Sequence, residues 1–586
     1  MSTDYKYCNS LTAYSRFRTR VVRIGNVSMG GHFPIRIQSM TNTNTLDTIA
    51  TVEQSIRLIE AGCEYIRIAA PGIKEAKNLA QIKKELHHRG YETPLIADIH
   101  FNPAIAEIAA RIVEKIRINP GNYADKKKFG KIEYSPARLP ARQGYSGGDA
   151  EYAEEIERIR ERINPLIRIC KEYGTAIRIG TNHGSLSDRI VNRYGDTPHG
   201  MVESAFEFIR ICEDLDFRNF VLSMKASNSK VMIAAYRLLV HRMMKENMDY
   251  PLHIGVTEAG SGEEGRIKSA AGIGVLLEDG IGDTIRVSLT EEPEAEIPVA
   301  KILINRYAGK SSPAPMSKIE ESPVDPFKYH RRHTNEVLNI GKNNSPVVIT
   351  KSHPLFSAKD YFKSKKKSTT ANFILTNTDI SIDFIEKIKD DPTVVIVLES
   401  DNLHAAVDLR RQIFCLIASH CKAPVIIKRN YSGISVEEFR LYASSDAALL
   451  ITDGLCDGLW LEAEGIKSEV IEKTAYDILQ ATGARIYKTE YISCPTCGRT
   501  SYNILDTVER VKQFTGHLKG LKIAIMGCVV NGPGEMTDAD YGYVGSSPGK
   551  INLYKGKELV RRNIDEKDAL DALINLIKEN GDWVEE

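Results

Sequence analysis

Eight short apolar segments, separated by patterns typical of amphipathic helices, limit the fold of this sequence more than any other feature. They follow one another at similar intervals between Arg36 and Thr290. Eight such βα units within about 255 residues are typical of a (β/α)8, or TIM, barrel. The expected strands cover residues 36–42, 65–71, 94–100, 115–121, 176–182, 219–227, 251–260 and 284–290.

Two segments outside the regular pattern predict how this barrel is completed. The sequence RVVRIGNVSMGG at 20–31 comes before the first strand and reads as a hairpin that closes the barrel floor. Residues 122–163 form an interval too long for a simple connection. Long insertions of this kind are usually lids or binding loops, so we expect one there.

The rest of the chain predicts further domains. A Ser/Pro-rich stretch precedes a second βα series, with expected strands at residues 346–350, 371–377, 393–400, 423–430 and 446–452. Near Ile486 the composition changes to Cys and Gly turns. We therefore expect an α/β protein with a TIM-barrel substrate domain (1–304), a linker (305–335), a βα insert domain that acts as a spacer (336–485) and a C-terminal α/β domain (486–586). The insert domain could be a partial barrel or a doubly wound sheet.

Charge and hydropathy exclude several functional classes. The net charge of +1 over 586 residues argues against a general nucleic-acid or membrane-surface binder. No apolar run approaches the roughly 18 residues of a membrane span. The first 20 residues lack the apolar core of a secretory signal, and their arginines give only a faint likeness to a transit peptide. We expect a cytoplasmic protein.

A repeated pattern in four strands predicts cations inside the barrel. An arginine stands between two aliphatic residues each time, at Arg67, Arg117, Arg178 and Arg286, and Lys225 lies on the sixth strand. Because side chains alternate across a strand, these cations point inward if their neighbours face the helices. Pairing with barrel carboxylates is one explanation. Five cations together favour an anionic ligand, and the planar fork of arginine suits a diphosphate.

Other polar residues end the same strands, at the face where TIM-barrel active sites lie. They are Asp98, His100, Asn119, Asn182, Thr257, Glu258 and Ser288. His100 alone is more often a structural histidine. Glu258 is of greater interest, because a carboxyl group among cations can exchange protons with a bound substrate.

Three of the ten cysteines are spaced like ligands. Cys494 and Cys497 form a CxxC turn, and Cys528 precedes the glycine-rich NGPGE turn. Glu535 could supply a fourth ligand. Three soft ligands favour an iron–sulfur cluster, but a zinc site and a redox dithiol remain open at this point.

Taken together, these motifs resemble those of one enzyme family over nearly the whole chain. They are GGHFPIRIQSMTNT, ADIHFNP, IRINPGN, RIGTNHGS, SMKAS, GVTEAG, CPTCGR and GCVVNGPGE. The chain resembles the larger, three-domain form of the 4-hydroxy-3-methylbut-2-enyl diphosphate synthase family, which acts in the methylerythritol phosphate route to isoprenoids.

The resemblance implies a cofactor and a set of site residues. It implies a [4Fe–4S] cluster in a C-terminal domain similar to sulfite-reductase modules, and a catalytic acid/base at Glu258. The implied cluster ligands are Cys494, Cys497, Cys528 and Glu535. The implied substrate contacts are Arg67, Asp98, His100, Arg117, Asn119, Arg178, Asn182, Lys225, Thr257, Arg286 and Ser288.

The resemblance also implies a reaction and its partners. The substrate would be 2-C-methyl-D-erythritol 2,4-cyclodiphosphate, and two electrons would arrive singly from ferredoxin or flavodoxin. The ring opens, a hydroxyl group leaves as water, and 4-hydroxy-3-methylbut-2-enyl diphosphate remains. We expect the protein to be a monomer or a homodimer. A zinc-containing TIM-barrel transferase acting on a diphosphate is the alternative enzyme, and an electron carrier or cluster scaffold is the non-enzymatic one.

Overall fold

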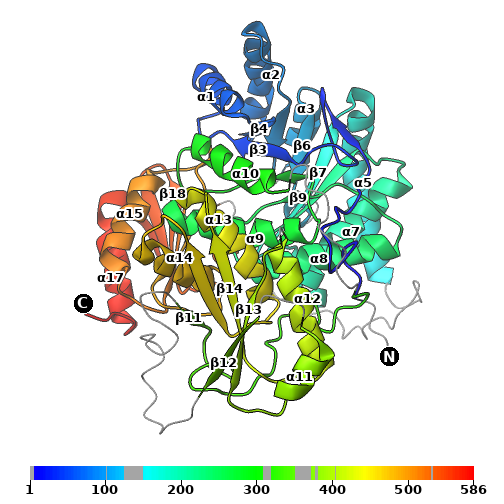
Figure 1. The fold of residues 1–586 in the computed structure, drawn as a ribbon. Helices are drawn as coiled ribbons and strands as arrows, with labels where there is room; N and C mark the ends of the chain where they lie inside the picture. The colour runs from blue at the N-terminus through cyan, green and yellow to red at the C-terminus, as the bar shows by residue number, and fades with distance from the viewer. Residues whose placement is uncertain are drawn as a thin grey trace.

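The structure is a computed structural model that describes residues 5–100, 102–123, 150–307, 319–349, 371–376, 380–402, 404–529 and 532–585. Figure 1 shows three parts: a barrel in blue to green, a second sheet in yellow-green below it, and a C-terminal part in orange and red beside it. Most of the predicted insertion and part of the predicted linker lie outside the described residues.

The first part is a parallel barrel in which each expected strand is present, so the prediction is confirmed. The sheet order is β8-β7-β6-β5-β4-β3-β10-β9, and a parallel bridge from Leu222 to Leu252 joins its two ends. The strands are β3 (Arg36–Met40), β4 (Tyr65–Ala69), β5 (Leu95–Asp98), β6 (Lys115–Ile118), β7 (Ala176–Asn182), β8 (Phe220–Lys225), β9 (His253–Ile254) and β10 (Thr284–Ile285).

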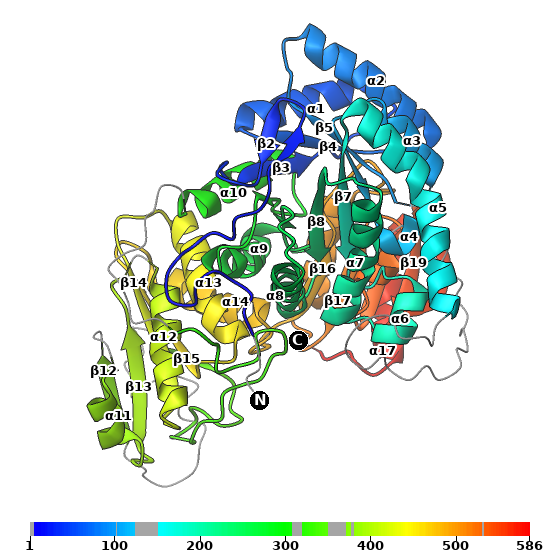
Figure 2. The same cartoon turned by 90° about the vertical axis from the view of Figure 1, so that its right-hand side faces the viewer.

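Helices surround these strands (Figure 2). They are α1 (Thr48–Ala61), α2 (Ile73–His88), α3 (Pro103–Ala110), α4 (Pro120–Tyr123), α5 (Ala150–Tyr173), α6 (Asp188–Tyr194), α7 (Pro198–Asp214), α8 (Ser229–Lys245), α9 (Gly262–Glu278) and α10 (Glu296–Asn305), with the 3₁₀ turn η1 (Pro293–Ala295) before α10. Polar caps start several of them; for example, the Asp47 side chain accepts from Ala50 N at α1.

The predicted hairpin forms the barrel floor. Strands β1 (Val22–Ile24) and β2 (Val27–Met29) are antiparallel. Their apolar side chains pack with inward-facing residues from the first layer of the barrel, such as Tyr65 and Val221. The hairpin therefore seals the end opposite to the strand C-termini.

The second part is an open parallel sheet covered by helices. Its order is β11-β15-β14-β13-β12. Its elements are β11 (Val347–Ile349), β12 (Asn372–Thr376), α11 (Ile382–Ile388), β13 (Val394–Glu399), α12 (Ala405–Ala418), β14 (Val425–Tyr431), α13 (Val436–Thr452), β15 (Gly458–Ala463) and α14 (Ser468–Ala481). Helix α13 packs along α9, so one buried apolar cluster runs from the barrel into this sheet.

One predicted strand is wrong. Residues 446–452 are the last turns of α13, and the strand lies later, at β15. A capping box of Ser435 and Glu438 starts the helix. Because its C-terminal half is buried all round, its apolar residues form a continuous run, which periodicity alone cannot distinguish from a buried strand.

The C-terminal part is a mixed sheet in the order β16-β17-β18-β19-β20. Its elements are β16 (Glu490–Ser493), α15 (Ile504–Thr515), β17 (Lys522–Met526), α16 (Gly532–Glu535), β18 (Tyr541–Ser547), β19 (Lys550–Lys555), β20 (Glu558–Asp565) and α17 (Glu566–Glu579). It has its own apolar core between the sheet and helices α15 and α17.

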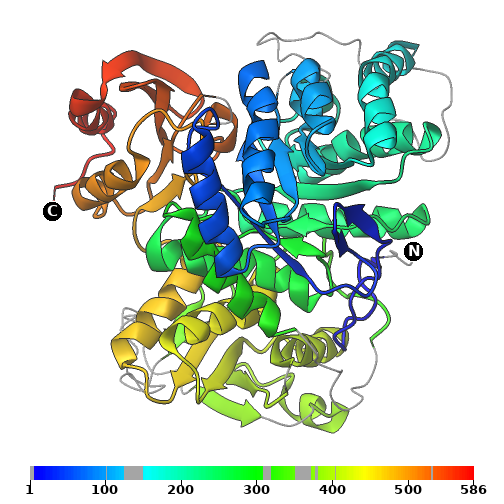
Figure 3. The same cartoon turned by 90° about the horizontal axis from the view of Figure 1, so that it is seen from above.

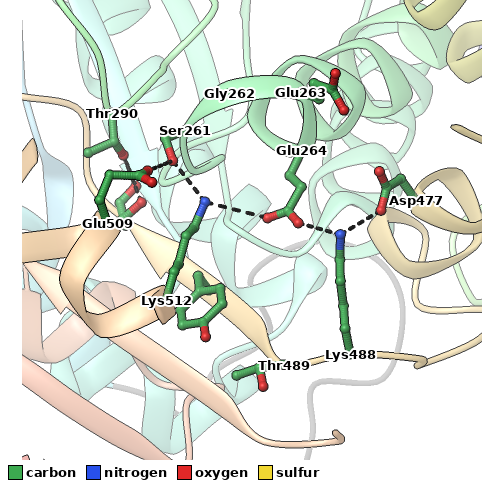
Figure 4. Close-up of polar contacts among 12 residues, drawn as sticks. Ser261, Gly262, Glu263, Glu264, Thr290, Asp477, Lys488, Thr489, Glu509 and Lys512 are labelled. Carbon is green, nitrogen blue, oxygen red and sulfur yellow. Dashed lines mark hydrogen bonds and ion pairs between the residues drawn. The ribbon is translucent and has the colours of Figure 1, made fainter. Parts of the chain in front are cut away.

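A charged junction joins the three parts (Figure 4). Lys488, between α14 and β16, pairs with Glu264 of α9 and lies 2.6 Å from Asp477 of α14. Lys512 of α15 donates to Ser261 at 2.9 Å and lies 3.6 Å from Glu264. Glu264 thus links the barrel to both other parts. In the described residues, no helix is both long and apolar enough to cross a membrane.

Candidate active site

A cavity lies between the C-terminal ends of the barrel strands and the loops of the C-terminal part. All the predicted site residues except Asn119 line it. From the barrel these are Arg67, Asp98, His100, Arg117, Arg178, Asn182, Lys225, Thr257, Glu258, Arg286 and Ser288, and from the C-terminal part Cys494, Cys497, Cys528 and Glu535. The two predicted groups, more than 200 residues apart in the chain, therefore share one space.

Asn119 is placed beside this cavity, not in its wall. It is fully buried at the end of β6, and its Oδ1 accepts from Gly121 N at 3.2 Å. Its Nδ2 has no hydrogen-bond partner among the described residues. Its local role is to start the α4 turn.

Asp98 is the carboxylate around which the cations gather. Arg499 Nη2 lies 3.0 Å from it, Arg117 Nη1 3.6 Å and Arg178 Nη2 3.9 Å. Burial alone would raise the pKa of Asp98, but Arg67 and Arg499 hold it well below its ordinary value. One carboxylate is thus shared by several guanidinium groups.

The buried cations destabilise one another. Burial lowers the pKa of Arg67 to about 10. Burial and Arg178 lower the pKa of Lys225 well below its ordinary value, and burial and Arg117 lower that of His100 to about 3. His100 is therefore neutral and accepts from Arg117, whose Nη1 lies 2.6 Å from its Nε2. An anionic ligand would relieve this repulsion.

Arg286 differs from the other barrel arginines because it has its own carboxylate partner. Its Nη2 and Nε donate to the two oxygens of Glu296 at 3.0 and 3.1 Å, and both side chains are buried. The structural explanation, a pair with a carboxylate, therefore holds for this arginine. Its partner comes from α10 and not from a barrel strand.

Glu258 sits in a strained and buried position. Its φ of +50° is in the left-handed region, which costs a non-glycine residue energy and persists only where surrounding structure imposes it. Its carboxyl group lies beside the carboxyl group of Glu535 in the cavity wall. Burial and this neighbour raise the pKa of Glu258 well above its ordinary value. Two carboxyl groups in contact can hold one proton between them.

The cysteines lie on turns that follow two neighbouring strands. Cys494 and Cys497 follow β16, and Cys528 follows β17. Gly527 N donates to Cys494 Sγ at 3.2 Å. Burial and the neighbouring Cys497 raise the pKa of the Cys494 thiol well above its ordinary value. The described residues contain no group of three or more His, Cys, Asp or Glu side chains arranged to hold a single metal ion.

The donor chemistry nevertheless fits an iron–sulfur cluster. Three sulfur atoms and the Glu535 carboxylate border the same cavity. Thiolates on such a cluster bind different iron atoms, so they need not surround a single point, and soft sulfur ligands suit iron.

The loops that carry these donors rest on the barrel of the same chain. Asn182 Nδ2 donates to Glu535 Oε1 at 2.8 Å, and Thr290 Oγ1 lies 2.7 Å from Ser493 Oγ. Gly184 and Gly534 are in such close contact that a Cβ on Gly184 would lie 1.9 Å from the Gly534 carbonyl oxygen. The barrel and the C-terminal part of one chain are therefore in direct contact at the cavity.

Sequence reasoning missed Arg499, which also lines the cavity. Its position two residues after Cys497 was a signal, because a cation beside thiolates stabilises their charge. Its barrel partner Asp98 is 401 residues away, and nothing in the sequence joins the two.

Comparisons with known proteins agree over almost the whole chain. Two family models match, described as the GcpE TIM-barrel domain over residues 19–301 and the GcpE protein C-terminal domain over residues 490–579. A relative from Parabacteroides distasonis is 48% identical over 97% of this chain and 99% of its own. One from Akkermansia muciniphila is 45% identical over 99% of each chain.

Both relatives are named 4-hydroxy-3-methylbut-2-en-1-yl diphosphate synthase (flavodoxin). A third, from Protochlamydia amoebophila, has the same name and is 43% identical over 99% of this chain and 98% of its own. These names give no support to the zinc-containing transferase. The chain therefore belongs to the 4-hydroxy-3-methylbut-2-en-1-yl diphosphate synthase family.

Proposed function

We propose that this chain converts 2-C-methyl-D-erythritol 2,4-cyclodiphosphate to 4-hydroxy-3-methylbut-2-enyl diphosphate in the cytoplasm. The ring C–O bond opens, one hydroxyl oxygen leaves as water, and two electrons and two protons are consumed. The single observation that carries the proposal is the cavity shared by the barrel cations and the cysteines. Flavodoxin, named for the relatives, is the proposed electron donor, and ferredoxin is the alternative.

The cations hold the diphosphate in this proposal. More cations than carboxylates line the barrel side of the cavity. Four of these cations are buried: Arg67, Arg117, Arg178 and Lys225. A diphosphate supplies the missing negative charge, and guanidinium groups bind phosphate oxygens in pairs. Arg286 adds a cation whose charge Glu296 partly offsets.

The other polar groups, together with the Asp98 carboxylate, orient the rest of the substrate. The proposed contacts to hydroxyl and ring oxygens are Asp98, His100, Asn119, Asn182, Thr257 and Ser288. All except the half-buried Thr257 are buried, so a contact made there is little weakened by competing water. Asn119 would act from behind the cavity wall, by fixing the α4 turn.

Glu258 is the proposed acid/base. Its Oε2 has no hydrogen-bond partner among the described residues, so it is available to a substrate oxygen. Its position between Thr257 and the Glu535 carboxyl group places it where the two predicted groups of site residues meet. It can therefore give a proton to the departing hydroxyl group.

Cys494, Cys497, Cys528 and Glu535 are the proposed ligands of a [4Fe–4S] cluster. When bound, such a cluster supplies electrons singly, which no side chain can do. Glu535 is a weaker ligand than a thiolate, and Asn182 of the barrel holds its Oε1 at 2.8 Å. The second part acts as a rigid spacer that holds the cluster over the barrel of its own chain. A monomer, or each subunit of a homodimer, therefore has a complete site.

Anaerobic purification tests the proposal. We expect an absorption band at about 400 nm from the cluster, and turnover of the cyclodiphosphate with a chemical reductant. Cys528→Ser should lose the band, most of the iron and the turnover, while its far-ultraviolet circular dichroism stays like that of the wild type. Full iron content in Cys528→Ser, or a colourless active wild-type protein, would contradict the cluster assignment.

A further inference from the structure

The barrel rim beside the CPTCGR loop is built from the segment after β3. Asn42 Nδ2 donates to Thr496 Oγ1 at 3.0 Å. Gly498 follows Cys497 directly and is so close to the rim that a Cβ there would lie 2.5 Å from the Thr43 carbonyl oxygen. This segment therefore borders the loop that carries two of the proposed cluster ligands.

Large apolar side chains are exposed on the same rim. Leu46 and Ile49 are 47% and 54% exposed, and Ile73, at the start of α2, is 45% exposed. Asn78 of α2 ties the two helix starts together, because its Nδ2 donates to Thr45 O at 2.7 Å and to Thr48 Oγ1 at 2.9 Å. Seen from above in Figure 3, α1, the darker blue helix, lies between α2 and the orange and red C-terminal part.

Lysines flank these apolar residues. Lys74 and Lys77, on the first two turns of α2, are exposed, and neither forms an ion pair with another described residue. The nearby carboxylates of Asp47 and Glu75 both lie at helix N-termini, whose partial positive charge offsets them. We call Leu46, Ile49, Ile73, Lys74 and Lys77 the rim patch; it is an apolar centre with two exposed lysines beside it.

Two other sides of the cysteine loops carry contacts between the parts of the chain. On the barrel side, Asn182 contacts Glu535 and Thr290 contacts Ser493. On the side of α9, Lys488 and Lys512 lie against Glu264 (Figure 4). The outer side of the CPTCGR loop, where the rim patch lies, makes neither set of contacts in the described residues.

We propose that the rim patch is the docking surface for the electron donor, an acidic flavin-carrying protein. The inference rests on the proposed function, which requires a protein donor. A flavin passes electrons through the apolar edge of its ring, which fits the apolar centre, while carboxylates around the ring pair with Lys74 and Lys77. Charge pairing of this kind steers encounter and fixes orientation. A donor seated there lies against the loop of Cys497.

Two assays on the same purified enzyme test this inference. One drives turnover with reduced flavodoxin, and the other uses dithionite with a viologen dye, which reaches the cluster without docking. The variants are Lys74→Glu with Lys77→Glu, and Leu46→Ser with Ile49→Ser. Lys84→Glu is the matched control, because Lys84 is also exposed but lies toward the far end of α2.

We expect the KM for flavodoxin to rise by roughly tenfold or more in both double variants, and to depend less on salt after charge reversal. Dithionite-driven turnover should stay within about twofold of the wild type, as for surface changes generally. Lys84→Glu should change neither assay.

Three results would overturn the inference. An unchanged KM for flavodoxin in both double variants would place docking elsewhere. An equal fall in the two assays would assign the rim patch to stability or catalysis. Loss of a dimer with unchanged KM would assign it to a second copy of the chain. If the wild type shows no turnover with dithionite, the proposed function itself fails, which is a separate outcome.

Discussion

Arg499 of the C-terminal part donates two hydrogen bonds to Asp98 of barrel strand β5, one to its carbonyl oxygen at 2.7 Å and one to its carboxylate at 3.0 Å. The bonds hold the loop of Cys497 against the barrel. They also hold the Asp98 carboxylate toward that loop, although Arg117 and Arg178 lie within 3.9 Å of it. One arginine thus positions both the loop and the main counter-charge of the cation cluster.

The first prediction concerns this contact. Arg499→Met should reduce kcat by roughly 30-fold or more, because the C-terminal part is no longer fixed over the substrate. Arg499→Lys keeps the charge but not the fork, and should recover part of the loss. Steady-state kinetics and iron content should be measured together. Iron loss in proportion to kcat would show that Arg499 only maintains the cluster site.

A second prediction separates two barrel arginines that the sequence treats alike. Arg117→Met should weaken cyclodiphosphate binding by about 1.5–3 kcal/mol, the scale of a charge-assisted hydrogen bond, without lowering Tm. Arg286→Met should also lower stability, by about 3 kcal/mol, because it leaves Glu296 buried without its cation. Isothermal titration calorimetry measures the change in cyclodiphosphate affinity, and thermal unfolding measures the change in Tm.

The control for Arg286 is its partner. Arg286→Met combined with Glu296→Gln removes both charges, so Tm should recover while affinity stays low. If the double variant is no more stable than Arg286→Met, the pair is not the reason for the loss.

Much of this fold could be predicted because its signals are local. The arginine between two aliphatic residues recurs in four strands, and the alternation of side chains dictates that all four face inward. The spacing of the CxxC turn and of Cys528 can likewise be read directly from the sequence, and it is typical of metal or cluster ligands. These patterns predicted the four arginines and the three cysteines that line the cavity.

The rest depended on partners that are distant in the chain. Nothing near Arg499 indicates Asp98, and nothing in the pattern of β10 shows that Arg286 would turn to Glu296 of α10. The error at residues 446–452 has a different cause. Burial of α13 against α9 removed the polar face by which a helix is recognised.

A third prediction uses pH at the junction of the three parts. Burial alone would raise the pKa of Asp477, but Lys488 holds it below its ordinary value. The stability that this pair contributes is therefore present above the unfolded pKa of about 3.9, and is lost as pH falls through the lower folded value. Asp477→Asn should lower Tm at pH 7, and the difference from the wild type should shrink at pH values below about 4.

Asp565 provides the matched control for that experiment. Its carboxylate also pairs with a lysine, Lys550 at 2.8 Å, but the pair is open to solvent. Asp565→Asn should leave Tm unchanged at pH 7, since exposed pairs contribute little. A constant Tm difference for Asp477→Asn across the whole pH range would show that its effect comes from packing and not from charge.

The last prediction tests whether one chain holds a complete active site. The contacts of Asn182 with Glu535 and of Arg499 with Asp98 join the C-terminal part to the barrel of its own chain. Two inactive variants should therefore fail to complement each other: Cys528→Ser lacks the cluster, and Glu258→Gln lacks the proton donor, which should cost roughly 100-fold in turnover. They are mixed under conditions that let subunits exchange, with exchange confirmed by differently labelled chains. We expect no activity above the sum of the two. In an equal mixture, recovery toward a quarter of the wild-type rate would mean that the cluster of one chain serves the barrel of another, because half of the dimers are then mixed and each has one intact site. The second part would then not be a spacer that returns the cluster to its own barrel.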